Sequence, residues 1–176
     1  ADLLAQAEHD PDAQPLLVTT SKEFADKVSI EVDEQLKTLS TKAIAEVSVQ
    51  NNGLIIIAEN IDEAIFISNK RAPEHLELEV KDVESIIPKL RNYGSLFIGA
   101  YSAEALGDYS SGLNHTLPTN FASRYTGGLS VKDFIKIQTT LRGTKDGIAE
   151  ITETAGILAD AEGLAGHARS VRAREA

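Results

Sequence analysis

Hydrophobic positions in the first hundred residues form short apolar runs, and longer amphipathic stretches separate them. Short runs rich in Leu, Ile and Val are typical of strands, whereas apolar residues repeating every three or four positions are typical of helices. The pattern predicts helices at 1–8, 20–39, 60–69 and 82–91, alternating with strands at 15–19, 54–58, 76–80 and 95–99. The longest apolar run, 54–58, is expected to be a buried strand. Alternating strands and helices indicate an α/β fold.

Local signals mark several boundaries of these elements. Thr20 followed by Glu23 is a capping-box pattern that predicts the start of the second helix, and Asn60 followed by Glu63 does the same for the third. Pro88 interrupts the fourth helix, which is expected to end near Gly94. The buried face of the second helix is expected to include Phe24, Val28 and Ile30.

The second half of the chain has a different pattern. Residues 100–128 are rich in Gly, Ser, Asn, Pro and Tyr without sustained periodicity, and a loop of that length is usually functional. From Val131 onward the sequence predicts helix, followed by a second alanine-rich helical run. The apolar positions at helical spacing are Ile148, Ile151, Ala155, Leu158, Ala159, Leu164 and Val171. Because this apolar face is narrow, the tail is expected to pack on another surface, such as that of a second subunit.

Composition narrows the class of protein. The 176 residues, 42% of them hydrophobic, suffice for one core and an appendage. A net charge of −10 argues against nucleic-acid binding, and the terminal Arg169, Arg172 and Arg174 are interpreted as a solvated helix face rather than a partner patch. No apolar run has transmembrane length and no signal peptide is evident, so a soluble, cytoplasmic protein without membrane contact is expected. The first helix lacks an entry signal, which suggests a piece of a longer polypeptide.

The chemistry available is that of imidazole and oxygen, because the chain has four histidines and no cysteine. Gln6 and His9 lie three positions apart, so on a helix they face the same way and could bind one ion. The alternative is an ordinary solvated helix end.

Adjacent acid and imidazole groups follow a proline. Pro73 is expected to end the preceding helix and to present Glu74 and His75 where the next strand begins. Such a pair can divide general acid and base work, because imidazole titrates near neutrality and burial can raise the pKa of a carboxyl. The alternative is a histidine that is hydrogen-bonded within a turn.

The segment 107–119 is the strongest local signal. Gly107 and Gly112 permit close backbone approach, while Asp108, Asn114 and His115 offer a carboxylate, an amide and an imidazole. These groups suit a metal or a polar ligand, and the alternative is a structural loop built on an Asx turn. Near the end of the chain, Glu162 and His167 taken alone are interpreted as surface residues.

Taken together, four segments resemble histidinol dehydrogenase, in the same order along the chain. They are Gln6-Ala7-Glu8-His9, the run 68–78 with Pro73-Glu74-His75, the segment 107–119, and the tail Glu162-Gly163-Leu164-Ala165-Gly166-His167. The resemblance covers essentially all 176 residues but only the C-terminal part of that family's chain. It implies an α/β fold in which residues 1–128 form the C-terminal part of an incomplete Rossmann-like domain and residues 129–176 form a helical dimerisation tail. The glycine fingerprint of Rossmann dinucleotide sites, G-x-G-x-x-G, does not occur in the sequence.

The resemblance also implies a site and a reaction, the oxidation of L-histidinol through L-histidinal to L-histidine with reduction of two NAD. It implies that His75 is the base for the alcohol proton and that Glu74 activates the water that adds to the aldehyde. His115 and Glu162 would contact the substrate. The zinc ligands, which would also surround the substrate, would be Gln6, His9, Asp108 and His167. In a homodimer, Glu162 and His167 would serve the site of the partner subunit.

Two other classes of function stay open on the residues alone. A metal-dependent hydrolase could use Gln6, His9 and Asp108 as ligands and Glu74 as base, without NAD. A noncatalytic oligomerisation module would use the tail for assembly, with incidental histidines.

Overall fold

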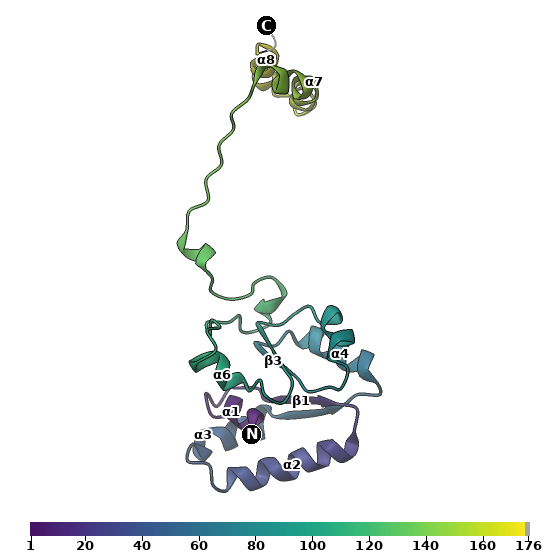
Figure 1. The fold of residues 1–176 in the computed structure, drawn as a ribbon, viewed down its shortest axis with the longest axis vertical. Helices are drawn as coiled ribbons and strands as arrows, with labels where there is room; N and C mark the ends of the chain where they lie inside the picture. Colours follow the sequence, from purple (N-terminus) through teal and green to yellow (C-terminus); the bar gives the residue numbers. More distant parts are fainter. Residues whose placement is uncertain (175–176) are drawn as a thin grey trace. The chain divides into compact units, whose positions relative to one another are not determined.

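The computed structural model describes residues 1–174 and divides into two compact units, Ala1–Phe134 and Ile135–Ala176 (Figure 1). The predicted tail, 129–176, extends to two residues, 175 and 176, that lie outside the described part of the chain.

The first unit contains two small parallel sheets. Strand β1 (Leu16–Thr19) pairs with β2 (Leu54–Ile57), and β3 (His75–Leu78) pairs with β4 (Ser95–Ile98). All four strands were predicted, and the α/β fold class is confirmed. Parallel strands need a crossover connection, and in each pair the segment that joins the two strands along the sequence is helical.

Three helices accompany the first sheet: α1 (Asp2–Ala7), α2 (Lys22–Leu36) and α3 (Lys42–Asn52). They share a core formed by Leu4, Ala7, Leu36 and Ala45. The capping prediction was wrong by one residue, because Ser21 is the N-cap and its hydroxyl accepts a hydrogen bond from the Phe24 N–H at 3.1 Å. Helix α3 was not predicted.

The buried face of α2 also differs from the prediction. Phe24 and Ile30 are 50% and 63% exposed, and Val28 is only partly buried. The residues that α2 buries are Ala25 and Leu36, with Val32 packed beside the core. The helix is therefore rotated relative to the expected face, since its contacts are with α1 and α3 as well as with the sheet.

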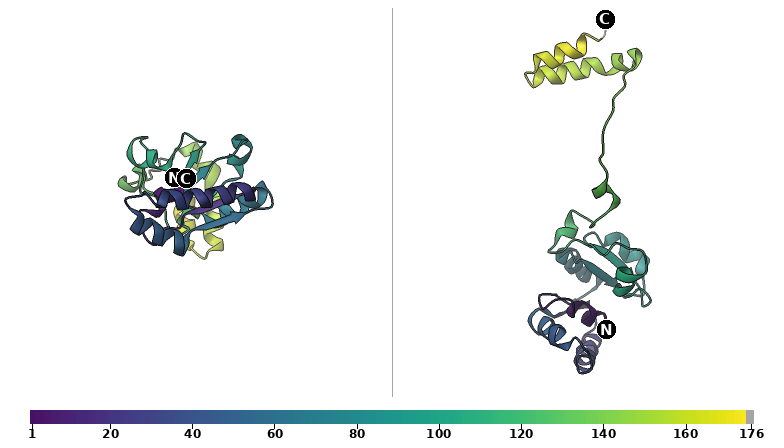
Figure 2. Two further views of the ribbon diagram at one scale, coloured as in Figure 1. Left: turned by 90° about the horizontal axis from the view of Figure 1, so that it is seen from below. Right: turned by 90° about the vertical axis from the view of Figure 1, so that its left-hand side faces the viewer.

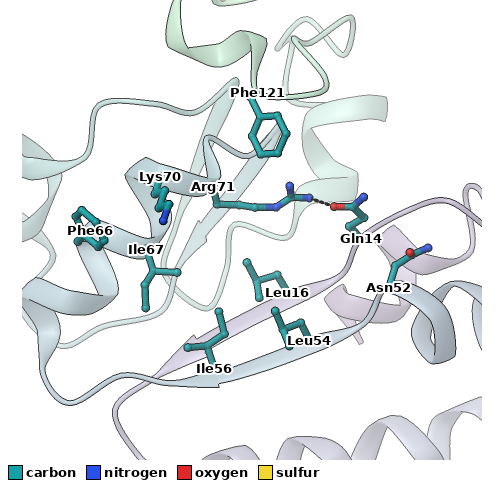
Figure 3. Close-up of a pocket in the computed structure, with 10 residues that line it drawn as sticks. All are labelled: Gln14, Leu16, Asn52, Leu54, Ile56, Phe66, Ile67, Lys70, Arg71 and Phe121. Carbon is teal, nitrogen blue, oxygen red and sulfur yellow. Dashed lines mark hydrogen bonds between the residues drawn. The ribbon is translucent and has the colours of Figure 1, made fainter.

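Strand β2 was expected to be buried, and this was wrong. Leu54 and Ile57 are 54% and 50% exposed, because the described chain supplies β2 with one strand neighbour only, β1. A pocket of about 450 Å³ opens beside this sheet (Figure 3). Its lining is Gln14, Leu16, Asn52, Leu54, Ile56, Phe66, Ile67, Lys70, Arg71 and Phe121.

The second sheet packs on α4 (Ile61–Arg71) and α5 (Val83–Ile86). The predicted cap of α4 is confirmed, since Asn60 Oδ1 accepts a hydrogen bond from the Glu63 N–H at 2.9 Å. Helix α5 is shorter than predicted and continues as the 3-10 turn η1 (Ile87–Lys89), because Pro88 has no N–H to donate. Ile65, Leu78, Ile86 and Leu90 form the core here.

The segment 100–128, expected to be irregular, contains the short helix α6 (Glu104–Tyr109) and the 3-10 turn η2 (Ala122–Arg124). A further turn, η3 (Val131–Phe134), closes the first unit. The prediction of helix from residue 131 onward was wrong for residues 135–144, which form neither helix nor strand.

The second unit is a hairpin of α7 (Lys145–Ala161) and α8 (Ala165–Arg172), which lie side by side in Figure 2. Ala159 and Ala168 are buried between the helices, whereas Ile151 and Leu158 are exposed. Arg169, Arg172 and Arg174 are exposed, as expected for a solvated helix face, and Arg172 also pairs with Asp160 at 2.7 Å and lies over Gly156. Among residues 1–174, no helix has the length and apolar character needed to cross a bilayer.

Candidate functional site

Five of the predicted site residues lie near one another in the first unit. Gln6 belongs to α1 and His9 follows it, Glu74 and His75 stand at the start of β3, and Asp108 belongs to α6. The Gln6 Oε1 atom lies 2.9 Å from His75 Nδ1. His9 and Asp108 both contribute electrostatically to Glu74 and to His75. Segments distant in the sequence therefore converge on one place.

The turn before β3 fixes the backbone of Glu74. Ala72 ends α4 in the left-handed conformation, with φ 50°, and its carbonyl accepts a hydrogen bond from the buried Ser123 hydroxyl at 2.9 Å. The Gly94 N–H donates to the Pro73 carbonyl at 3.0 Å. A Cβ at Gly94 would lie 2.5 Å from the Glu74 carbonyl oxygen, so this close approach requires glycine.

Three side chains lie close to the His75 ring. Besides Gln6 at Nδ1, its Nε2 lies 3.3 Å from Glu104 Oε1, and its ring packs against Phe97 with the centroids 6.0 Å apart. The Nε2 and Oε1 atoms are close but not aligned as a hydrogen bond, and each is buried without a hydrogen-bond partner. Of these contacts, the one with Gln6 is a hydrogen bond and the one with Phe97 is ring packing.

Glu104 is a site residue that sequence reasoning missed. It is 4% exposed, and its backbone N–H donates to Glu77 Oε1 at 3.1 Å. It stands four positions before Asp108, so both carboxylates project from the same face of α6. That spacing was the available signal, but it has meaning only once residues 104–109 are known to be helical.

Burial and neighbouring charge shift the titration of three of these groups. Burial raises the pKa of Glu74, and the charges of Asp108 and Glu104 add to the rise while His75 and His9 oppose it. Burial lowers the pKa of His75, against the opposing effects of Glu74 and Asp108. Burial and Asp108 raise the pKa of Glu104. The shifts favour a basic carboxylate at Glu74 and a neutral imidazole at His75, which is the form able to accept a proton.

The same residues offer a group of metal-binding atoms. One ligand atom from each of His75, Glu104 and Asp108 lies within 4.8 Å of the others. Imidazole and carboxylate are ligands that zinc accepts, and the unpartnered Glu104 oxygen is available to a cation. The donors present therefore fit zinc. This cluster shares one residue, Asp108, with the set of zinc ligands that the resemblance implies.

Three predicted residues do not lie with the other five. His115 is exposed in the loop after α6, where Asn114 forms the Asx turn foreseen as the alternative, its Oδ1 accepting from the Thr116 N–H at 2.9 Å. Glu162 caps the C-terminal end of α7, and His167 is an exposed residue of α8, both in the second unit. Their roles stay predictions.

Gly107 keeps α6 close to β4. A Cβ at this position would lie 2.8 Å and 3.0 Å from two ring carbons of Phe97, the side chain that packs on His75. We expect Gly107→Ala to push the ring and α6 apart, which would lower the free energy of unfolding by about 1–3 kcal/mol. Urea unfolding measures the change. Gly127→Ala is the control, since nothing lies within 4 Å of its Cβ position. Equal stabilities of the two variants would contradict the prediction.

Comparison with known proteins gives a consistent result. The histidinol dehydrogenase family matches residues 1–175. A histidinol dehydrogenase from Oceanobacillus iheyensis is 46% identical over 175 residues, which cover 99% of this chain and 41% of that protein. One from Thiocapsa roseopersicina is 41% identical over 175 residues, covering 99% of this chain and 75% of that protein.

A solved structure agrees with these matches. The crystal structure of histidinol dehydrogenase from Elizabethkingia anophelis has a TM-score of 0.93 and 40% sequence identity, covering 98% of this chain and 40% of that chain. The chain thus spans about two fifths of the length of the Oceanobacillus and Elizabethkingia proteins. Both the residues of the cluster and the matches over nearly the whole sequence lead to one assignment: this chain belongs to the histidinol dehydrogenase family.

Proposed function

We propose that the chain forms the C-terminal part of a histidinol dehydrogenase subunit, which oxidises L-histidinol through L-histidinal to L-histidine as the last steps of histidine biosynthesis. The observation that carries the proposal is the convergence of Glu74 and His75 with Gln6, His9 and Asp108. In this proposal, residues outside the region that matches the relatives complete the site. The Rossmann-like arrangement and the cytoplasmic location belong to the same proposal.

Glu74 and His75 divide the proton transfers of two successive oxidations. His75 takes the hydroxyl proton as the alcohol carbon loses a hydride. Glu74 then takes a proton from water as the water oxygen adds to the aldehyde carbon, and the resulting hydrate loses the second hydride. The shifts support these roles, because a raised pKa makes the Glu74 carboxylate a stronger base and a lowered pKa favours the neutral His75 imidazole, which can accept a proton. Each NAD, when bound, accepts one hydride, so the two oxidations use two NAD.

Zinc is proposed to be held by Gln6, His9 and Asp108 of one subunit, with His167 of the partner subunit as the fourth ligand. A bound zinc ion supplies a Lewis acid that orients nitrogen and oxygen donors of the substrate. Gln6 can contribute only its amide oxygen to a metal, and that atom lies 2.9 Å from His75 Nδ1. Gln6 would therefore have to turn its oxygen away from His75 when a metal binds.

The second unit is proposed to serve a homodimer, with Glu162 and His167 completing the site of the partner subunit and His115 contacting the substrate. Exposed apolar side chains on the hairpin support an interface, because packing them against another chain would remove them from water. They are Ile151, Ile157, Leu158 and Leu164. Neither a nucleic acid nor a membrane is part of the proposal.

The experiment uses a grafted subunit, in which this chain replaces the matched 41% of the Oceanobacillus protein. With zinc, L-histidinol and NAD, the grafted subunit is expected to form two NADH per histidine. The intact Oceanobacillus protein is the control for assay conditions. An active control beside an inactive graft would contradict the proposal. Histidinol-independent hydrolysis without NAD would favour a metal-dependent hydrolase, and a dimer without zinc or turnover would favour an oligomerisation module.

Sharing of sites between subunits gives a separate prediction. Grafted subunits carrying His75→Ala and others carrying His167→Ala are each expected to be nearly inactive. If His167 acts in the partner's site, dissociating and reassociating the mixture should restore activity, because a mixed dimer contains one site with both histidines intact. Random mixing gives about half mixed dimers, hence about a quarter of the wild-type activity. A mixture no more active than its components would show that His167 acts within its own subunit.

A further inference from the structure

The His75 ring lies between two polar side chains from different elements. Gln6 of α1 faces Nδ1 at 2.9 Å, and Glu104 of α6 faces Nε2 at 3.3 Å. The ring of Phe97 packs against the imidazole from β4. Neither the resemblance read from the sequence nor the roles proposed above use Glu104.

Glu104 is built into the fold rather than placed on its surface. Its side chain is almost wholly buried, and its backbone N–H is held by Glu77, which belongs to the same strand as His75. Burying a carboxylate is costly unless it gains a partner. Its Oε1 atom has no hydrogen-bond partner and faces the imidazole. The fold therefore keeps the Glu104 carboxylate buried, at a cost in free energy, beside a His75 nitrogen that can donate a hydrogen bond to it.

Three buried polar atoms of this group lack hydrogen-bond partners: Gln6 Nε2, His75 Nε2 and Glu104 Oε1. Two of them are satisfied together if His75 Nε2 carries a hydrogen and the Glu104 carboxylate turns into line to accept it. A half-turn of the Gln6 amide then satisfies the third, because its Nε2 becomes the donor to the His75 Nδ1 lone pair. The same half-turn moves the Gln6 oxygen away from His75, as its proposed role in metal binding requires.

We propose that Glu104 is a positioning residue for His75, which accepts a hydrogen bond from Nε2 and so fixes the tautomer whose lone pair is on Nδ1. This inference deepens the proposed function, in which His75 is the base. Nδ1 is then the atom that takes the substrate proton, with the substrate hydroxyl displacing Gln6. Histidines that accept protons or bind metals are commonly oriented through their other ring nitrogen in this way. Catalytic hydrogen bonds that are long or poorly aligned without substrate commonly tighten in the complex, and we expect the separation of 3.3 Å to shorten in this way.

The first test measures the tautomer in the 176-residue chain itself, without substrate. Long-range ¹H–¹⁵N spectra of ¹⁵N-histidine-labelled protein resolve few signals, since the chain has four histidines, and His75→Gln assigns the relevant one. At a pH where His75 is neutral, we expect the Nε2–H tautomer in the wild type and a mixture in Glu104→Ala. Glu79→Gln, which replaces an exposed carboxylate directly after β3, is the control and should leave the tautomer unchanged. An Nδ1–H tautomer in the wild type would overturn the proposal even if Glu104→Ala failed to fold.

The second test uses the grafted subunit. Glu104→Ala is expected to lower kcat by about 10- to 100-fold with little change in KM or in zinc content. Glu104→Gln retains an acceptor oxygen and should recover part of the loss. A loss of zinc as large as that of Asp108→Ala would instead make Glu104 a metal ligand and overturn the positioning role, as would an unchanged kcat. If the wild-type graft does not oxidise histidinol, the proposed function fails, while the tautomer measurement still decides the role of Glu104.

Discussion

Asp108→Ala in the grafted subunit is expected to remove zinc and to abolish turnover. Asp108 is common to the ligand set proposed for zinc and to the observed cluster of His75, Glu104 and Asp108, so either arrangement loses a ligand. The neutral methyl group also leaves Glu104 without the neighbouring carboxylate that raises its pKa. Metal polarisation contributes several kcal/mol to such reactions, which corresponds to a fall in kcat on the order of 10³-fold or more.

The measurement is zinc per subunit after exhaustive dialysis, by atomic emission, together with NADH formation from L-histidinol. Asp33→Ala removes an exposed aspartate of α2 and should keep wild-type zinc and activity. Far-UV circular dichroism tests that Asp108→Ala remains folded. Retention of one zinc per subunit in a folded Asp108→Ala protein would show that the metal site lies elsewhere.

His9→Ala separates the two ligand sets, because His9 belongs to the proposed set and not to the observed cluster. Weakened zinc binding in this variant is the expected result. Full zinc retention in His9→Ala, beside loss in Asp108→Ala, would instead place the metal between His75, Glu104 and Asp108.

The strands were predictable because their apolar runs are short and are bounded by turn residues. Burial was harder to predict. The apolar run 54–58 is typical of a strand that another layer covers, but the run does not show which segment supplies that layer. In the described chain β2 has a strand only on one side, and Leu54 and Ile57 stay exposed. The hydrophobic pattern thus predicts where a strand forms. Whether that strand is buried depends on which other segments pack against it.

The candidate site was predictable where a local motif carries the chemistry. Pro73 and the left-handed Ala72 place Glu74 and His75 at the start of β3, as the sequence indicated. Glu104 was not predictable, because α6 is only six residues long and includes Gly107, which disfavours helix. Gly107 is tolerated there because the backbone must approach Phe97 closely. The contribution of His167 depends on a partner subunit, so it stays a prediction.

Glu74→Gln is expected to uncouple the two oxidations. Glutamine keeps the size of the side chain but cannot take a proton from water, whereas the first oxidation relies on His75. The Glu74 backbone oxygen still accepts the Ser95 N–H, at 2.9 Å, so the start of β3 should keep its structure. Loss of a general base typically slows a step by about 10²- to 10⁴-fold. The slowed step should be the second one, and L-histidinal should accumulate.

The measurement is the ratio of NADH formed to L-histidinol consumed in the grafted subunit, with the aldehyde trapped by a hydrazine reagent. The ratio should fall from two toward one in Glu74→Gln and stay at two in Glu79→Gln, where the replaced carboxylate is exposed. His75→Gln should slow consumption of L-histidinol itself, because it removes the base for the first step. When L-histidinal is supplied directly, Glu74→Gln should be impaired as strongly as in the full reaction. A ratio of two, with the aldehyde oxidised at the wild-type rate, would mean that another group activates the water.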